Sequence, residues 1–355
     1  MSTPSDPPIR IGVIGAGGIF RTRHLPGLRA IDGVELAAVC NRSEASSEQA
    51  RSEWGFERIA ADWESLVAAD DVDAVMIGTW PYTHRAMSVA ALEAGKHVFC
   101  QARMAMDLPE AEAMHAAAER HPDRVGLICP PPHRMPYEPY LRGVLERGEL
   151  GEPLEASLVC TNGSNLGELN WRERVEYSGQ QALQLGIWAE TLIAWLGEYE
   201  TLSATAATPI AAKPDPERSG ADYAIAIPQV VRVQGRLKSG VVIGEHHSGV
   251  NPAEPRNELT LVGRAKTLRV RIVEGLMELQ ASEGGGRFEA VDVPEDQTNP
   301  WRVEEEFIAA VRAAERGDDW RALHRDSPDF ATGLKYMRKV NAVHRSVDEG
   351  RAVSV

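Results

Sequence analysis

Three glycines near the amino terminus, Gly15, Gly17 and Gly18, have the spacing of a phosphate-binding turn. They follow an apolar run at 9–14 and precede a stretch that can continue as a helix. Glycine tolerates positive φ and allows another group to approach the backbone closely. A helix that begins at such a turn presents unpaired N–H groups and the positive end of its dipole to a pyrophosphate. The dinucleotide fingerprint usually has a third small residue where this chain has Phe20.

The residues after a second apolar run, at 34–40, bear on which dinucleotide would bind. In dinucleotide-binding folds, an acid at the end of the second strand accepts a hydrogen bond from the adenosine 2′-hydroxyl. Here Asn41, Arg42 and Ser43 stand at that point, and Arg42 with Ser43 suits a 2′-phosphate instead. Glu44 follows at once, so NAD remains an alternative, and we favour NADP.

Strands and helices alternate through the first 130 residues and would position this turn. Further apolar runs at 73–78, 96–100 and 125–129 have the character of strands, with helical patterns between them. This order predicts a parallel, doubly wound sheet whose ligand crevice lies at the carboxyl ends of the strands. The residues expected to contact the cofactor are Gly15, Gly17, Gly18, Ile19, Asn41, Arg42, Ser43, Thr79, Trp80, His84 and Gln101.

The second half of the chain has a different pattern. An amphipathic helix at 136–149 is followed by β-prone runs joined by short turns, which predict a large, mainly antiparallel sheet backed by helices. The polar stretch 206–221 is expected to be an exposed loop. The predicted fold class is therefore α/β, with a dinucleotide-binding domain at 1–130 and an α+β substrate and oligomerisation domain at 131–355. We expect the last helix, at about 328–349, to pack back near the first domain.

Composition excludes several classes of function. The 355 residues are 43% hydrophobic, which suffices for two domains. A net charge of −14 argues against nucleic-acid or anionic-membrane partners. No apolar run approaches the ~20 residues that span a bilayer, and residues 1–8 do not resemble a signal peptide. The four cysteines form no CxxC pair, so we expect reduced thiols in a cytoplasmic protein and no metal site.

Motifs along nearly the whole chain resemble one known family. They are GVIGAGGI (12–19), T-x-P-x-x-H (79–84), ALEAGKHVFC (91–100), ERGELGEPLEASL (146–158), GQQALQLGIWAETLIAWLGE (179–198) and VDEGRAVSV (347–355). Together they are similar to the glucose–fructose oxidoreductase, inositol dehydrogenase and MocA family of NAD(P)-dependent sugar and polyol dehydrogenases. The resemblance implies a carbohydrate-like substrate, and a homodimer or homotetramer formed through the open face of the second sheet.

The chain departs from that family at its catalytic positions. The family's Glu-Lys-Pro, which holds the catalytic lysine, is replaced by Gln101-Ala102-Arg103, and its Asp/His pair by Gln184 and Trp188. A neutral Gln or Ala cannot act as a general base near neutral pH, and Trp offers only an N–H donor. The family's usual mechanism therefore cannot be carried over to this chain.

Two interpretations arise from this loss: the site is rebuilt from other residues, or turnover has been lost. We favour rebuilding, with Arg103 binding an anionic or carbonyl group. Gln184 and Trp188 stay in the expected site, with Trp188 either in the core or stacked on a sugar. Other candidates for a base or substrate ligand are His133, Arg134, Tyr177, Glu190, His246 and His247. Successive strand residues face opposite sides, so at most one of His246 and His247 can reach the site.

The predicted function is NAD(P)-dependent hydride transfer to or from a sugar, polyol or sugar-acid derivative. Arg103 would orient the substrate, and His133, Tyr177 or Glu190 would handle the proton. One alternative is a lyase, glycoside-cleaving or epimerising enzyme that keeps NAD tightly bound. Another is an inactive nucleotide-binding sensor or assembly subunit.

Overall fold

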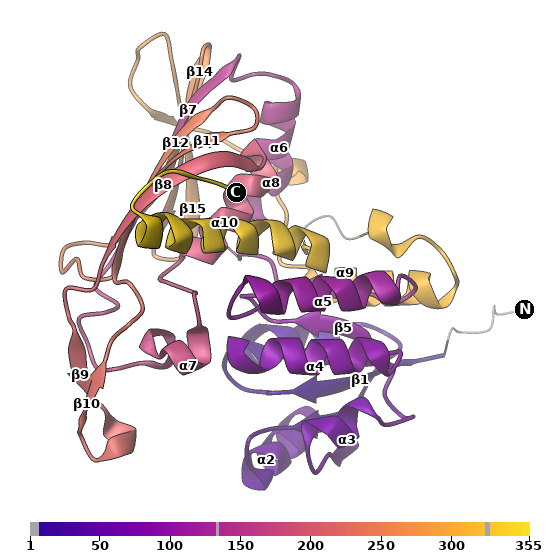
Figure 1. The fold of residues 1–355 in the computed structure, drawn as a ribbon. Helices are drawn as coiled ribbons and strands as arrows, with labels where there is room; N and C mark the ends of the chain where they lie inside the picture. Colours follow the sequence, from indigo (N-terminus) through magenta and orange to yellow (C-terminus); the bar gives the residue numbers. More distant parts are fainter. Residues whose placement is uncertain (1–6, 133–134, 324–326) are drawn as a thin grey trace, which may run out of the picture. The chain divides into compact units, whose positions relative to one another are not determined.

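The chain folds into two compact units, seen in a computed structural model that describes residues 7–132, 135–323 and 327–355. The first unit comprises Met1–Ala105, Pro109–Pro130 and Arg302–Leu334; the second comprises Met106–Leu108, Pro131–Trp301 and Lys335–Val355 (Figure 1). Among the described residues, no helix is long and apolar enough to cross a membrane.

The first unit is built on a six-stranded parallel sheet with the order β3-β2-β1-β4-β5-β6. Its strands are β1 (Ile9–Ile14), β2 (Val34–Cys40), β3 (Arg58–Ile59), β4 (Ala74–Ile77), β5 (His97–Cys100) and β6 (Gly126–Ile128). Its helices are η1 (Phe20–His24), α1 (Leu25–Arg29), α2 (Glu44–Trp54), α3 (Trp63–Val67), α4 (Pro81–Glu93), α5 (Leu108–Arg120), α9 (Val303–Glu315) and η6 (Trp320–Ala322). The central strands β4 and β5 are buried throughout, as continuous apolar runs in a parallel sheet require. The predicted doubly wound sheet is confirmed.

Residues 302–334, which the sequence pattern grouped with the second domain, lie in the first unit. A buried polar contact explains why. The His24 Nδ1 atom lies 2.5 Å from Glu304 Oε1, with both side chains at most 3% exposed. Trp320 also donates its indole N–H to the Pro122 carbonyl at 3.2 Å. Neither contact joins residues that are close in the sequence.

The second unit contains a nine-stranded sheet with the order β16-β15-β14-β13-β7-β12-β11-β8-β17. Its strands are β7 (Pro153–Thr161), β8 (Tyr199–Ala207), β11 (Val230–Leu237), β12 (Val242–Ser248), β13 (Arg256–Gly263), β14 (Lys266–Val273), β15 (Leu276–Glu283), β16 (Glu289–Ala290) and β17 (Val353–Ser354). Its helical elements are η2 (Met135–Tyr137), α6 (Glu138–Glu146), η3 (Trp171–Glu173), α7 (Val175–Ser178), α8 (Leu185–Leu196), η4 (Pro216–Arg218), η5 (Glu295–Gln297) and most of α10 (Phe330–Glu349). Of the described strand pairings in this sheet, only that of β7 with β12 is parallel. The mainly antiparallel sheet that was predicted is confirmed.

A two-stranded hairpin begins inside the polar stretch 206–221, which was expected to be an exposed loop, and ends just after it. It consists of β9 (Ala212–Pro214) and β10 (Asp222–Ala224). Lys213 donates to Glu173 Oε2 at 2.8 Å, and Arg174 forms a two-pronged contact with Asp215. All four side chains are at most 6% exposed. Two charged residues of the stretch, Lys213 and Asp215, are therefore buried against partners some 40 positions earlier in the chain. Glu217 and Arg218 are exposed, as expected.

A buried charge cluster ties α10 to the sheet of the second unit. Glu245 on β12 accepts hydrogen bonds from Tyr199 Oη at 2.7 Å and from Lys339 Nζ at 2.8 Å, and lies 2.9 Å from His247 Nε2. Burial acts to raise the pKa of the Glu245 carboxyl, but Lys339 and His247 outweigh it and hold that pKa at about 2. The carboxylate is therefore charged in the folded protein at neutral pH.

We expect Glu245→Gln to destabilise the protein by about 3–5 kcal/mol, because it leaves the buried Lys339 ammonium without a counter-charge. Glu245→Gln combined with Lys339→Met should recover most of that loss. The folded pKa of about 2 lies below the ordinary value of 4.5, so Glu245 stabilises the fold above about pH 4.5 and loses this effect as the pH falls toward 2. Urea unfolding across this pH range measures both effects. If the unfolding free energy of the double variant fell with pH as steeply as that of the wild type, Glu245 would not be the group whose protonation destabilises the fold.

Candidate functional site

The glycine turn lies at the carboxyl end of β1, next to the end of β4. Gly15 has a φ of +86°, and a Cβ at this position would lie 2.9 Å from the carbonyl carbon of Gly78. Gly18 also has a positive φ, of +37°. Because Ile14 pairs with Ile77 in the parallel register, the residues after them necessarily meet. The turn therefore requires glycine at position 15 for both conformation and space.

Phe20 occupies the place of the missing third small residue without disturbing the turn. Its side chain is fully buried, and a Cβ at Gly78 would lie 2.5 Å from its ring. In the usual fingerprint the third glycine permits close packing between helix and strand. In this chain Gly78, which follows β4, has no side chain, and the Phe20 ring packs into the space that this leaves.

The backbone at 17–19 borders open space and has N–H groups without an acceptor in the described part of the chain. A Cβ at Gly17 or Gly18 would meet no atom within 4 Å. The N–H groups of Gly18 and Ile19 donate to no acceptor among the described residues, whereas those of Gly15 and Ala16 bind the Cys40 carbonyl and the Asn41 side chain. Free N–H groups at the start of a helical segment, next to open space, fit a bound pyrophosphate.

The three residues after β2 have different roles. Asn41 accepts from the Ala16 N–H at 2.7 Å and donates to the Ser46 carbonyl at 2.8 Å, so its side chain holds the turn in place. Ser43 caps α2 by accepting from the Ser46 N–H. Arg42 is exposed, and its guanidinium pairs with no residue in the part of the chain that the structure describes. Of the three, Arg42 is the side chain left to meet a ligand.

Thr79, which follows β4, and His84 on α4 form hydrogen bonds within the protein. The His84 ring is fully buried, with Nδ1 2.9 Å from the Arg103 carbonyl and Nε2 3.1 Å from the Thr79 carbonyl. Burial lowers the pKa of this imidazole. The ring links the segments that come after β4 and β5, and it has no exposed surface for a ligand. The Thr79 hydroxyl lies 2.6 Å from that of Thr83, and Trp80 directly precedes α4.

Gln101 belongs to a chain of buried polar contacts that sequence reasoning missed. Its Oε1 accepts from the Ala102 N–H at 2.8 Å, and its Nε2 lies 3.2 Å from His24 Nε2. An amide nitrogen only donates, so His24 Nε2 accepts and Nδ1 carries the proton toward Glu304. No local pattern could reveal this pair, because His24 and Glu304 are 280 positions apart.

Arg103 lies inside the first unit, with 8% of its surface exposed. The peptide bond that joins it to Ala102 is cis. Among the other candidates, Tyr177 on α7 is half-buried and Glu190 on α8 is buried. His247 is fully buried and His246 is not, which agrees with their expected opposite directions. His133 and Arg134 lie outside the described residues.

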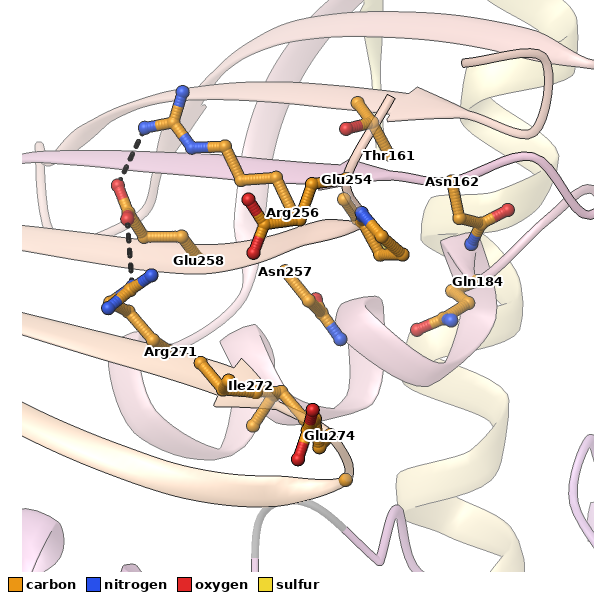
Figure 2. A pocket seen from close by; sticks show the side chains of 14 residues that line it. Thr161, Asn162, Gln184, Glu254, Arg256, Asn257, Glu258, Arg271, Ile272 and Glu274 are labelled. Carbon is orange, nitrogen blue, oxygen red and sulfur yellow. Dashed lines mark hydrogen bonds and ion pairs between the residues drawn. The ribbon is translucent and has the colours of Figure 1, made fainter. Parts of the chain in front are cut away.

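The second unit holds a cavity of about 590 Å³ where β7 and β14 end, β13 starts and α8 begins (Figure 2). Gln184 lines it together with Asn162 and Asn257. Trp188 lies one helical turn further on, fully buried, and donates its indole N–H to Asn257 Oδ1 at 3.0 Å. It therefore belongs to the core and offers no exposed face to a sugar. Sequence reasoning missed Asn257, since only the strand register places it opposite Cys160.

Known proteins match part of the chain in sequence. Residues 9–128 match the family described as "Oxidoreductase family, NAD-binding Rossmann fold". A 4-carboxy-2-hydroxymuconate-6-semialdehyde dehydrogenase of a Sphingobium species is 32% identical over 40% of this chain and 44% of its own. A 1,5-anhydro-D-fructose reductase of Ensifer adhaerens is 31% identical over 50% and 53%, and an inositol 2-dehydrogenase of Burkholderia lata is 32% identical over 44% and 47%. The chain thus matches about half the length of these relatives.

Solved structures resemble the chain over nearly its whole length. Levoglucosan dehydrogenase in complex with NADH and L-sorbose superposes with a TM-score of 0.83 at 20% identity, covering 98% of both chains. An NAD-binding oxidoreductase from Klebsiella pneumoniae gives 0.81 at 22% identity, covering 98% and 99%. At these identities the likeness establishes the fold of both units.

The contact of Gly78 with the turn yields a direct test. A methyl group in Gly78→Ala would lie 2.4 Å from the Gly15 carbonyl oxygen, and we expect it to cost about 1–3 kcal/mol of unfolding free energy. Gly126→Ala on β6 is the matched control, since its Cβ would meet only Phe330 at an ordinary 3.5 Å. Urea unfolding measures both variants. Equal stability of the two would contradict the close approach of Gly78 to the turn.

The turn, the parallel sheet and the family match all fall in one segment of the chain. It contains the strands β1 to β6, the glycines of the turn and the residues after β2. Residues 9–128 therefore carry the NAD-binding Rossmann fold of the glucose–fructose oxidoreductase, inositol dehydrogenase and MocA family of oxidoreductases.

Proposed function

We propose that the protein is an NAD(P)-dependent oxidoreductase that transfers a hydride to or from a sugar, polyol or sugar-acid derivative. The observation that carries the proposal is the glycine turn, whose free N–H groups at Gly18 and Ile19 lie beside open space. The names of the relatives, inositol 2-dehydrogenase and 1,5-anhydro-D-fructose reductase among them, support a carbohydrate-like substrate. When bound, a nicotinamide ring would supply or accept the hydride.

The chain's own residues support NADP over NAD. Arg42 is exposed and forms no ion pair within the described residues, and Asn41 and Ser43 are occupied by the backbone. A guanidinium in this position suits a 2′-phosphate, which it can contact through two parallel hydrogen bonds. Gly15, Gly17, Gly18 and Ile19 would hold the pyrophosphate. Thr79, Trp80, His84 and Gln101 would contribute mainly by shaping the backbone around the bound cofactor.

The proton would be handled by residues other than the family's lysine and histidine. Neither Ala102 nor Gln184 can titrate, and Trp188 is buried. We assign substrate orientation to Arg103 and proton transfer to His133 or Tyr177, with Gln184 as a neutral ligand. Full activity of Arg103→Met on a substrate that the wild type turns over would refute the first assignment. Full activity of both His133→Ala and Tyr177→Phe would refute the second.

The lack of a base at the family positions favours a second candidate, a protein that binds nucleotide without turnover. It would bind NADPH, consume none across a broad sugar panel, and bind another protein. A third, a lyase or epimerase, would instead retain NAD through many turnovers.

We also propose a cytoplasmic homodimer or homotetramer formed through the open face of the nine-stranded sheet. A monomer in sedimentation experiments at micromolar concentration would contradict that assembly.

Titration with NADPH and NADH, detected by energy transfer from tryptophan, tests the cofactor assignment. We expect tighter binding of NADPH, and a loss of about tenfold or more in NADPH affinity in Arg42→Ala, because a charged hydrogen bond contributes roughly 1.5–3 kcal/mol. NADH affinity should be unchanged. Arg120→Ala, which removes an exposed arginine on α5, is the control. An equal loss for both nucleotides, or none, would contradict the role of Arg42.

A further inference from the structure

The cavity of the second unit has an unusual balance of polar groups. One wall carries the neutral amides of Asn162, Gln184 and Asn257 (Figure 2). Two arginines also line the cavity, but Glu258 lies between them, 2.7 Å from the Arg256 guanidinium and 3.6 Å from that of Arg271. The Arg271 guanidinium also lies 3.1 Å from Glu278, so each of the two arginines has a carboxylate partner inside the protein.

Two further carboxylates make the cavity unsuitable for an anion. Glu254 and Glu274 line it, are exposed, and form no ion pair within the described residues. Three carboxylates therefore face two guanidiniums, counting Glu258. A ligand carboxylate would be repelled, whereas hydroxyl groups can bind to amides without any charge. The cavity thus fits an uncharged polyhydroxylated ligand better than a sugar acid.

The orientation of the Asn257 amide, one of the three on this wall, is fixed by a hydrogen bond from Trp188. The Trp188 indole N–H lies 3.0 Å from Asn257 Oδ1, and the Trp188 side chain is fully buried. An indole nitrogen only donates, so the atom that faces it must be the amide oxygen. The Nδ2 group of Asn257 consequently points away from Trp188, into the cavity and toward Gln184 (Figure 2). Gln184 lies on the same wall, where α8 begins.

The Cys160 sulfur is a second acceptor beside the Trp188 indole, and the hydrogen bond between them acts to lower the pKa of the thiol. Cys160 lies opposite Asn257 in the strand register. Burial raises the pKa of the Cys160 thiol to about 12, so this sulfur stays a neutral, weak acceptor. The oxygen of Asn257 is the stronger acceptor, which keeps the amide in one orientation.

We propose that Trp188 is a positioning residue, which holds Asn257 so that its Nδ2 group donates to an oxygen of an uncharged polyhydroxylated ligand in this cavity. The inference rests on the proposed function, whose substrate class it narrows to uncharged sugars and polyols. The position at which the family carries a proton-transferring histidine thus serves ligand orientation in this chain. Proton transfer to or from the substrate would then be carried out by His133 or Tyr177, as proposed above.

The test uses the full-length protein with a ¹⁵N label and three probes: L-sorbose, myo-inositol and D-glucuronate. The Asn257 side-chain signals are assigned by their loss in Asn257→Asp. We expect the uncharged probes to shift these signals and D-glucuronate to bind more weakly. Trp188→Phe keeps most of the ring but removes the donor, and should weaken L-sorbose or myo-inositol binding about three- to tenfold.

Trp195→Phe is the matched control, because it removes an indole hydrogen bond from the same helix, to Glu138 Oε2 at 2.6 Å. It should lower the thermal stability without changing probe affinity. Wild-type affinity in Trp188→Phe, preference for D-glucuronate, or no shift of the Asn257 signals with any probe would each overturn the proposal. NADPH binding is measured on the same samples. Its absence beside intact probe binding would overturn the proposed function and leave the role of Trp188 standing.

Discussion

The first unit depends on the contact between two glycines at the ends of neighbouring parallel strands. Gly15 and Gly78 approach so closely that a single methyl group on either would overlap the other's backbone. Because Gly78 has no side chain, the Phe20 ring can pack against it. The N–H groups of Gly18 and Ile19, which donate to no acceptor among the described residues, follow this contact in the chain.

In the second unit, buried polar contacts fix the positions of the helices. Glu245 joins β8, β12 and α10 through Tyr199, His247 and Lys339. Trp188 joins α8 to β13 through Asn257. The Trp188 indole has a single donor, so its contact with Asn257 fixes an orientation as well as a distance. These contacts hold α8 and α10 to the strands of the sheet.

Sequence reasoning predicted the features that local patterns determine. β2 and β11 have the expected bounds, and the glycine turn comes directly after β1, because continuous apolar runs and glycine spacing are visible in the chain itself. The short β3 escaped prediction, since two residues have no periodicity. The hairpin β9–β10 escaped because its charged residues looked solvated, while Lys213 and Asp215 are buried against Glu173 and Arg174.

Long-range contacts account for most of the unpredicted part of the site. The pairs His24–Glu304 and Trp188–Asn257 join residues 280 and 69 positions apart, and no spacing in the sequence announces them. The resemblance indicated that Gln184 and Trp188 stand at former catalytic positions. It could not show that the first lines a cavity while the second is buried behind it. Nor could it show Asn257, which the register of β13 with β7 places opposite Cys160.

The most direct measurement of the central claim traces a deuterium label. The protein is incubated with NADPH deuterated at C4 of the nicotinamide and with a panel of uncharged ketoses and aldoses, and the products are analysed by mass spectrometry and NMR. An oxidoreductase of the kind proposed should transfer deuterium to a carbinol carbon as NADPH is consumed. Bound but unconsumed NADPH, with no deuterium in any sugar, would contradict the claim and leave a nucleotide-binding protein without turnover.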